Sequence, residues 1–261
     1  MNVIVLLAGI IDPNRTVSAA DILQELSGGP ELPRKLSPFD ESALECALRL
    51  RDSDASIRVS AFLVGHKVPD ALLRTVAAFR PDRMGGIALS AGQIWDTQAM
   101  AQRLAAVAAG QAGAEMVLMG RQFGDMDDGV IAPAVAEQLR WPFVGLAQEV
   151  LRDADRWEFM RERGDLTERI RVESPVLASV TNDRRNRLRF PLMRNISSAK
   201  KERFSVGAIG ENTGTAIEGG GVTLQSLTDR AIGRPHATGR LLTGTPEAQA
   251  GELAAWLRGK A

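Results

Sequence analysis

The chain has 261 residues, with 32 basic and 32 acidic side chains and therefore no formal net charge. This balance gives no general attraction to nucleic acid or to a membrane surface, and no apolar run approaches the roughly 20 residues of a membrane span. One cysteine, Cys46, excludes an internal disulfide bond, and two distant histidines, His66 and His236, make a zinc site unexpected. We expect a cytoplasmic bacterial protein with no nucleic-acid partner and no membrane insertion.

The first half of the chain alternates strands and helices. Apolar runs predict strands at residues 2–7, 57–64, 85–89, 116–119 and 143–146. Apolar residues at helical spacing predict helices at residues 18–26, 40–48, 68–79, 96–109 and 131–139, with Asp40 as the cap of the second. This alternation predicts a Rossmann-like α/β fold, in which a parallel sheet carries helices on both faces.

The pattern changes after residue 146. Apolar and charged residues alternate on both sides of Gly164-Asp165, which predicts an edge hairpin over about 156–173 with one solvent-exposed face. A short strand at 176–180 and a basic, solvated segment at 182–189 follow.

Residues 204–244 are rich in Gly and Thr, and such a composition cannot bury enough apolar surface for a separate core. A last helix begins after Thr245-Pro246. We therefore expect a domain of residues 1–203 and an arm of residues 204–261, which lies on a partner or folds back on its own domain.

Residues 115–145 form the most informative stretch, a strand, a polar loop, a helix and a strand. The loop contains Asp125, Asp127 and Asp128, and it lies where open α/β sheets bind anions and nucleotides. These aspartates can hold a magnesium ion, but we favour a solvated acidic loop at a helix N-terminus. The common nucleotide fingerprints do not occur, and no serine or cysteine has a plausible activating histidine and acid. The residues alone indicate a nucleotide-type fold without visible catalytic machinery.

Four features of the sequence resemble the beta subunit of electron transfer flavoprotein. The family's N-P-F-x-E-x-A-x-E-x-A segment resembles Ser37-Pro38-Phe39 followed by Glu41, Ala43, Leu44, Glu45 and Ala47. Its G-K-Q-x-x-D…W-P block resembles Gly120-Arg121-Gln122 with the aspartates after it and Trp141-Pro142. Its signature, ending P-N-I-x-x-A-K-K, resembles Pro175-Val176, Asn186, Arg189, Phe190, Asn195, Ile196, Ala199, Lys200 and Lys201. The tail with its late helix is similar to the family's partner-embracing arm.

The resemblance implies an adenine-nucleotide-hydrolase-like α/β domain whose C-terminal arm wraps an alpha subunit in a heterodimer. FAD is then held mainly by the alpha subunit, with the beta subunit supplying one wall, and the beta subunit buries a structural AMP. The heterodimer takes electrons from a flavoprotein dehydrogenase and delivers them to the membrane enzyme electron transfer flavoprotein-quinone oxidoreductase. On this interpretation the chain is an electron carrier subunit and not itself an enzyme.

The resemblance also assigns residues. The AMP positions fall on Leu6, Ser37, Pro38, Phe39, Val64, Gly120, Gln122, Asp125, Asp128, Gly129, Val130 and Ile131. The docking loop falls on residues 189–203, where the partner-docking positions are Arg189, Met193, Ile196, Lys200 and Lys201. Met193 stands in the place of the family's anchor leucine, whereas we expect Ile196 to pack inward.

Some positions depart from the family pattern. The family's Asn-Gln-Thr at the end of the nucleotide loop is Gly129-Val130-Ile131 here, which removes three polar side chains. The chain also lacks tyrosine, and the position beside the flavin falls near Pro13. We therefore expect AMP to bind weakly or not at all. A nucleotide-binding regulatory module of the same α/β fold and a fragment of an ATP-using ligase remain as alternatives.

Overall fold

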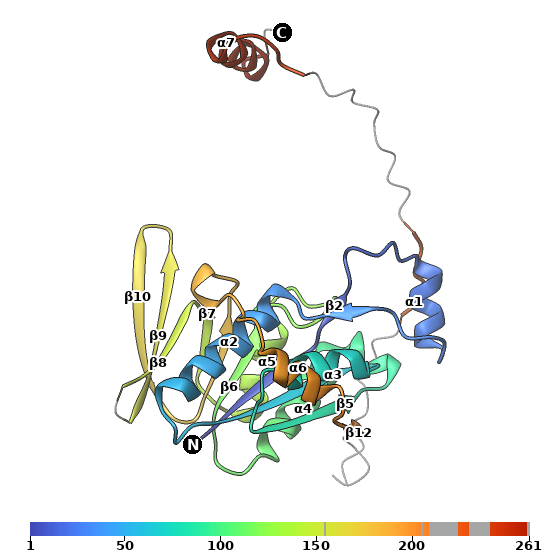
Figure 1. Cartoon of the computed structure of the whole chain (residues 1–261), viewed down its shortest axis with the longest axis vertical. Coiled ribbons are helices and arrows are strands. Elements are labelled where there is room, and N and C mark those ends of the chain that lie inside the picture. The colour runs from blue at the N-terminus through green and yellow to red at the C-terminus, as the bar shows by residue number, and fades with distance from the viewer. Residues whose placement is uncertain (154, 205, 209–223, 230–240, 260–261) are drawn as a thin grey trace. The chain divides into compact units, whose positions relative to one another are not determined.

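The computed structural model describes residues 1–153, 155–204, 206–208, 224–229 and 241–259, in two units, Met1–Leu227 and Thr228–Ala261. The strands of the main sheet are β1 (Asn2–Leu7), β4 (Arg58–Gly65), β5 (Arg83–Ala88), β6 (Ala114–Gly120), β7 (Phe143–Ala147), β11 (Val176–Val180) and β12 (Val206–Ala208). Within the described residues these seven strands are all parallel, in the order β12-β5-β4-β1-β6-β11-β7 (Figure 1). The predicted α/β fold with a parallel sheet is confirmed.

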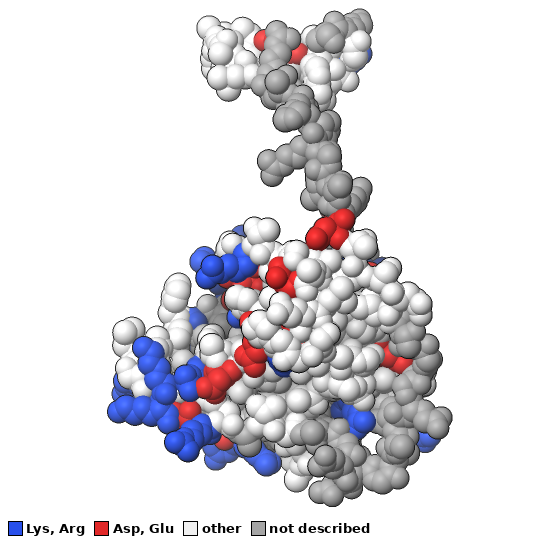
Figure 2. All heavy atoms as spheres, turned by 90° about the vertical axis from the view of Figure 1, so that its right-hand side faces the viewer, with Lys and Arg blue, Asp and Glu red and all other residues white. Residues whose placement is uncertain are grey.

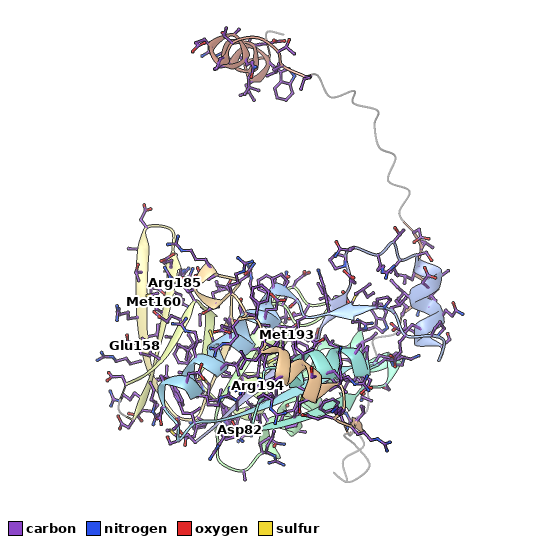
Figure 3. All side chains as sticks on the ribbon, in the orientation of Figure 1. Asp82, Glu158, Met160, Arg185, Met193 and Arg194 are labelled. Atoms are coloured by element: carbon purple, nitrogen blue, oxygen red, sulfur yellow. The ribbon has the colours of Figure 1, made fainter. Side chains whose placement is uncertain are left out.

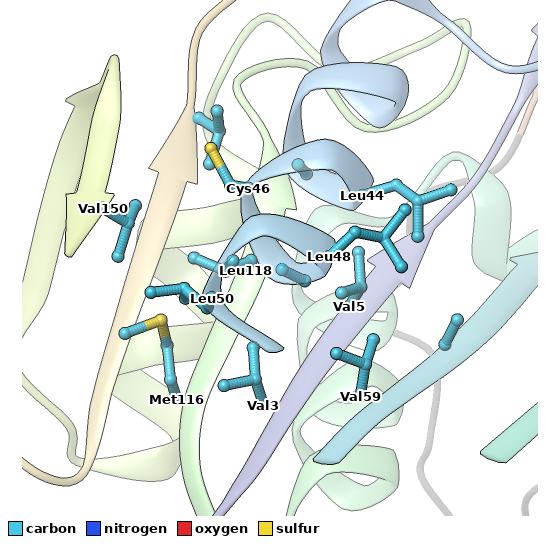
Figure 4. Close-up of a cluster of buried hydrophobic side chains, with 14 of the residues drawn as sticks. Val3, Val5, Leu44, Cys46, Leu48, Leu50, Val59, Met116, Leu118 and Val150 are labelled. Atoms are coloured by element: carbon cyan, nitrogen blue, oxygen red, sulfur yellow. The ribbon is translucent and has the colours of Figure 1, made fainter. Parts of the chain in front are cut away.

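Four helices of the first unit cover both faces of this sheet. They are α2 (Pro38–Ser53), α3 (Asp70–Ala77), α4 (Thr97–Ala109) and α5 (Ile131–Leu139). Alternate residues of β1 enter different cores: Val3 and Val5 pack with α2 and α3, whereas Ile4 packs with α4 and α5. Figure 4 shows the first core, where Leu48 of α2 lies beside Val5. Since β1 is buried on both faces, its sequence is apolar throughout, as a central parallel strand requires.

Helix α2 begins earlier than its sequence pattern predicts. Its N-cap is Ser37, not Asp40, so the predicted cap is wrong. Ser37 Oγ accepts a bond of 2.9 Å from the Asp40 backbone N–H, and the Asp40 carboxylate accepts one of 3.0 Å from the Ser37 N–H. This reciprocal capping box places Pro38 at the first helical position, where its missing N–H costs little.

The sequence patterns did not predict the short elements, because these span too few residues to show a hydrophobic period. They include the ribbon β2 (Ile10–Ile11) with β3 (Arg34–Lys35), the 3-10 turns η1 (Ala91–Ile94) and η2 (Arg184–Asn186), and α6 (Met193–Ala199). The predicted helix near 18–26 is confirmed as α1 (Ala19–Leu26). Because α6 lies inside residues 189–203, that segment is partly helical rather than a loop.

The predicted hairpin is confirmed as β9 (Arg156–Arg163) and β10 (Leu166–Glu173). It does not extend the main sheet, because it joins β8 (Glu149–Asp153) in a second, three-stranded sheet of order β10-β9-β8. Trp157 and Phe159 on β9 are fully buried in the core on the α2 side. The basic run after β11 is not wholly solvated either, since Asn186 is fully buried.

The described part of the second unit contains α7 (Pro246–Leu257). Thr245 caps it by accepting a bond of 3.3 Å from the Ala248 N–H, which confirms the predicted start of the last helix. Most of the Gly- and Thr-rich stretch 204–244, and His236 with it, lies outside the described residues. Among the described helices, none combines the length and the hydropathy needed to cross a membrane.

Candidate functional site

Two of the sequence motifs meet at the carboxyl edge of the sheet. Strand β6 ends at Gly120, directly against the first turn of α2. A Cβ atom on Gly120 would lie 2.8 Å from the Cβ of Phe39, closer than real Cβ contacts. Only glycine therefore allows the end of β6 to approach α2 so closely. This contact brings the Ser37-Pro38-Phe39 segment and the loop after Gly120 to one place.

The loop between β6 and α5 is organised by the carboxylate of Asp127, which is 8% exposed. One oxygen accepts bonds from the backbone N–H groups of Gly129 at 2.8 Å, Val130 at 2.7 Å and Ile131 at 3.2 Å. The other oxygen accepts a bond of 2.9 Å from the Phe123 N–H. The backbone donors at the start of α5, which would cradle a phosphate, are thus satisfied by the chain's own anion.

Asp125 ties the same loop to the N-terminal ribbon. Its carboxylate accepts bonds of 3.1 Å from the Ile11 N–H and 3.0 Å from the Arg34 guanidinium. Arg34 also pairs at 2.9 Å with Glu25, a residue that is 2% exposed. Asp125 and Asp127 are therefore both engaged within the protein.

A further carboxylate, that of Asp40, joins the end of β1 to the start of α2. It accepts bonds of 3.2 Å from the Ala8 N–H and 3.1 Å from the Gly9 N–H. Complete burial raises the pKa of Asp40, and the hydrogen bonds from Ser37, Ala8 and Gly9 act in the opposite direction. The role of Asp40 is to hold β1 and α2 together.

The cavity at this edge has a volume of about 80 Å³, below the about 300–1,000 Å³ of typical small-molecule sites. Of the residues assigned to AMP from the sequence, Val64 and Asp125 line it. The others lie elsewhere: Leu6, Ser37, Gly120 and Ile131 are buried, Phe39, Gln122 and Gly129 are half-buried, and Pro38, Asp128 and Val130 are exposed.

Sequence reasoning missed the basic residues of this cavity, Arg34, His66 and Lys67. The position of His66 and Lys67, immediately after the Gly65 that ends β4, was the available signal, because strand ends meet at one edge. The Lys67 ammonium donates to the backbone carbonyl of Gly29.

The second candidate surface begins at Arg189. Its guanidinium pairs with Glu45 of α2 at 2.8 Å and also bonds Asp52, while its backbone N–H donates to Glu45 at 3.1 Å. These carboxylates raise the pKa of Arg189 above its usual value, so it stays charged at every pH of interest. Arg189 therefore fixes the position of the chain that follows it.

Three large apolar side chains directly after Arg189 face solvent. Phe190 is 89% exposed, Leu192 55% and Met193 76%. Figure 3 shows Met193 and Arg194 on α6 at the surface of the first unit. Ile196, one turn along α6 from Met193, is half-buried against Ala77 and Ala78 at the C-terminal end of α3. We call residues 190–193 the apolar tip.

Basic residues flank the apolar tip in the sequence. Residues 184–203 contain eight basic side chains and one acidic one, Glu202, which pairs with Arg80 at 2.6 Å. Lys200 and Lys201 are both exposed. Figure 2 shows Lys and Arg side chains gathered on one flank of the first unit. An apolar tip within a basic surface favours a protein partner with an acidic surface and an apolar recess.

Comparison with known proteins assigns this architecture to a family. The family model described as the electron transfer flavoprotein domain matches residues 31–206. The electron transfer flavoprotein subunit beta of Megasphaera elsdenii is 28% identical over 181 residues, covering 65% of each chain. The corresponding subunit of Sus scrofa is 30% identical over 173 residues, covering 66% of this chain and 67% of its own.

A third relative is the acryloyl-CoA reductase electron transfer subunit gamma of Anaerotignum propionicum, which is 29% identical over 165 residues. That match covers 62% of this chain and 61% of the relative. The chain therefore matches somewhat under two thirds of the length of these first two bacterial relatives.

Proposed function

The chain belongs to the electron transfer flavoprotein family, and we propose that it is the beta subunit of a heterodimeric electron carrier. In this role it takes electrons, through FAD, from a flavoprotein dehydrogenase and passes them to a membrane quinone oxidoreductase. The chain itself carries out no substrate chemistry. The single observation that supports this proposal is the exposed apolar tip within the basic segment 184–203, because this combination has the composition of a protein-docking surface.

FAD supplies the electron chemistry when it is bound. A cavity of about 80 Å³ at the carboxyl edge of the sheet is too small for a flavin. We therefore place FAD at the joint with an alpha subunit, where this chain contributes a wall rather than the whole site. The exposed apolar residues of α7, Leu253, Trp256 and Leu257, support a helix that packs on that partner.

The AMP implied by the family does not fit the residues at the carboxyl edge. The side chain of Asp127 already accepts from the N–H groups of residues 129–131, so a phosphate there would meet a carboxylate instead of free donors. The exposed Val130 offers no polar atom from its side chain. The same arrangement disfavours the alternative function, a nucleotide-binding regulatory module.

The test is co-expression with the electron transfer flavoprotein alpha subunit encoded nearest to this chain's gene. We expect a 1:1 heterodimer with one FAD, and reduction of that FAD by the flavoprotein dehydrogenase encoded in the same neighbourhood. The chain expressed alone should bind no flavin. A stable monomer that retains FAD, or a heterodimer that accepts no electrons from the dehydrogenase, would show that the proposal is wrong.

A further inference from the structure

A groove lies beside the apolar tip, between α2, α3 and residues 187–191. Its volume is about 400 Å³, five times that of the cavity at the carboxyl edge. Leu36, Leu72 and Phe79 line it and are 5%, 3% and 9% exposed, so the groove has an apolar floor. Phe190 and Pro191 form one wall, and Ala71 and Thr75 of α3 form another.

The rim of this groove is basic. Lys35, which also lies 3.9 Å from Asp12, and Arg187 line the groove together with Glu41. The pKa of Glu41 is raised, because burial and the nearby Asp40 outweigh the charges of these two cations. Arg34 and Arg189 also line the groove, but their guanidinium groups are bonded to carboxylates of the chain. Together with the basic residues 184–203, the rim gives the whole region a positive character. The side chain that fits is therefore apolar and has acidic neighbours.

We propose that this groove receives an apolar side chain, flanked by carboxylates, from the electron-donating dehydrogenase. The inference rests on the proposed function, in which the apolar tip enters a recess on the same donor. The groove and the tip share Phe190, so the two contacts are adjacent. In one, the tip enters the dehydrogenase, and in the other a side chain of the dehydrogenase enters the groove. One anchor leaves a partner free to rotate about it, whereas two adjacent anchors fix its orientation relative to the flavin.

The test fills the groove in the assembled heterodimer. Ala71→Trp and Thr75→Trp each place an indole in the groove from exposed positions on α3, so the core is not disturbed. Ala20→Trp, at an exposed position on α1 that does not line the groove, is the matched control. The probe is the reduced flavoprotein dehydrogenase encoded near this chain's gene. Both groove variants should raise its apparent KM about tenfold, whereas the control, the FAD content and the melting temperature should stay at wild-type values.

Charge reversal provides an independent measurement. Lys35→Glu at the rim should raise the apparent KM and weaken its dependence on salt, whereas Arg163→Glu near the hairpin turn should not. The inference is wrong if both tryptophan variants accept electrons like wild type. It is also wrong if they reduce heterodimer formation, because the groove then binds the alpha subunit or α7. Failure of the wild-type heterodimer to accept any electrons would instead overturn the proposed function itself.

Discussion

Met193 is the residue at which the docking role is most directly testable. It is 76% exposed at the start of α6, so its side chain contributes little to the folded core. Methionine is flexible and polarisable, which suits a surface that must fit more than one partner. Burial of such a side chain in a complex contributes about 1.5–3 kcal/mol.

We expect Met193→Ala to raise the apparent KM for the dehydrogenase about tenfold or more, with unchanged FAD content and melting temperature. Steady-state reduction of the heterodimer's FAD measures the effect. Leu166→Ala is the control, because Leu166 is an equally apolar residue that is 67% exposed on the hairpin. If Met193→Ala and wild type show equal kinetics, Met193 is not part of the docking surface. If the variant unfolds, Met193 belongs to the core.

Asp127 supports a second prediction at the residue scale. Removal of its carboxylate leaves four backbone N–H groups without their acceptor, at a cost of about 1–3 kcal/mol. Asp127→Ala should therefore lower the denaturant midpoint, whereas Asp128→Ala should not, because Asp128 is exposed. Equal stability of the two variants would contradict the assigned role.

The position of Asp127 also predicts that the protein does not bind AMP. Because Asp127 satisfies the donors at the start of α5, acid extracts of the pure wild-type protein should release no stoichiometric AMP. Recovery of one AMP per chain would show that the loop rearranges to admit a phosphate, and would refute this interpretation of the carboxylate.

At the scale of elements, the three-stranded sheet has one face on the core and one face of paired charges. Glu158 of β9 accepts bonds of 2.8 Å from Arg169 and 2.9 Å from Arg171, both on β10. The hydrogen bonds from Arg171 and Arg169, with their positive charges, lower the pKa of Glu158. Cross-strand pairs of this kind hold the two strands in register.

This shift predicts how the stability of the hairpin depends on pH. Because the folded pKa is below the unfolded value, the pair stabilises the fold above the usual glutamate pKa of about 4.3, and the stabilisation is lost as the pH falls through the folded pKa. Melting temperatures measured from pH 7 down to about pH 3 should fall more steeply for wild type than for Glu158→Gln. Parallel curves for the two proteins would show that Glu158 does not titrate differently on folding.

At the scale of the whole molecule, the second unit presents an apolar helix face. On α7, Trp256 is 65% exposed and Leu257 is 70% exposed, far more than residues of a self-contained core. Such a face favours a partner protein, and aromatic residues dominate the binding energy of interfaces. We expect Trp256→Ala with Leu257→Ala to weaken association with the alpha subunit at least tenfold.

The measurement is the dissociation constant of the heterodimer, with the melting temperature of the isolated chain as the control for folding. Unchanged association would mean that α7 does not bind the partner. A lower melting temperature of the isolated chain would mean that α7 packs on its own protein instead.

The alternating strands and helices of the first unit were predictable from the sequence, apart from the short elements and the edge strand β12. Strand β11 and helix α5 have the bounds that their apolar patterns predicted, because buried parallel strands and amphipathic helices impose local periods on the chain. The sequence also determined the family, since the motifs around Phe39, Gly120 and Arg189 keep their order and spacing. The hairpin was predicted from the alternation of apolar and charged residues on both sides of Gly164-Asp165.

The contacts of the candidate residues became visible only in the folded chain. Nothing local in the sequence shows that Asp127 bonds the start of α5, that Arg189 pairs with Glu45 at a separation of 144 residues, or that the groove combines Leu36, Ala71 and Phe190. Each of these arrangements depends on which distant segments meet when the sheet forms. A local pattern specifies which residues are buried and which side chains are charged, but their partners are set by the packing of the whole chain.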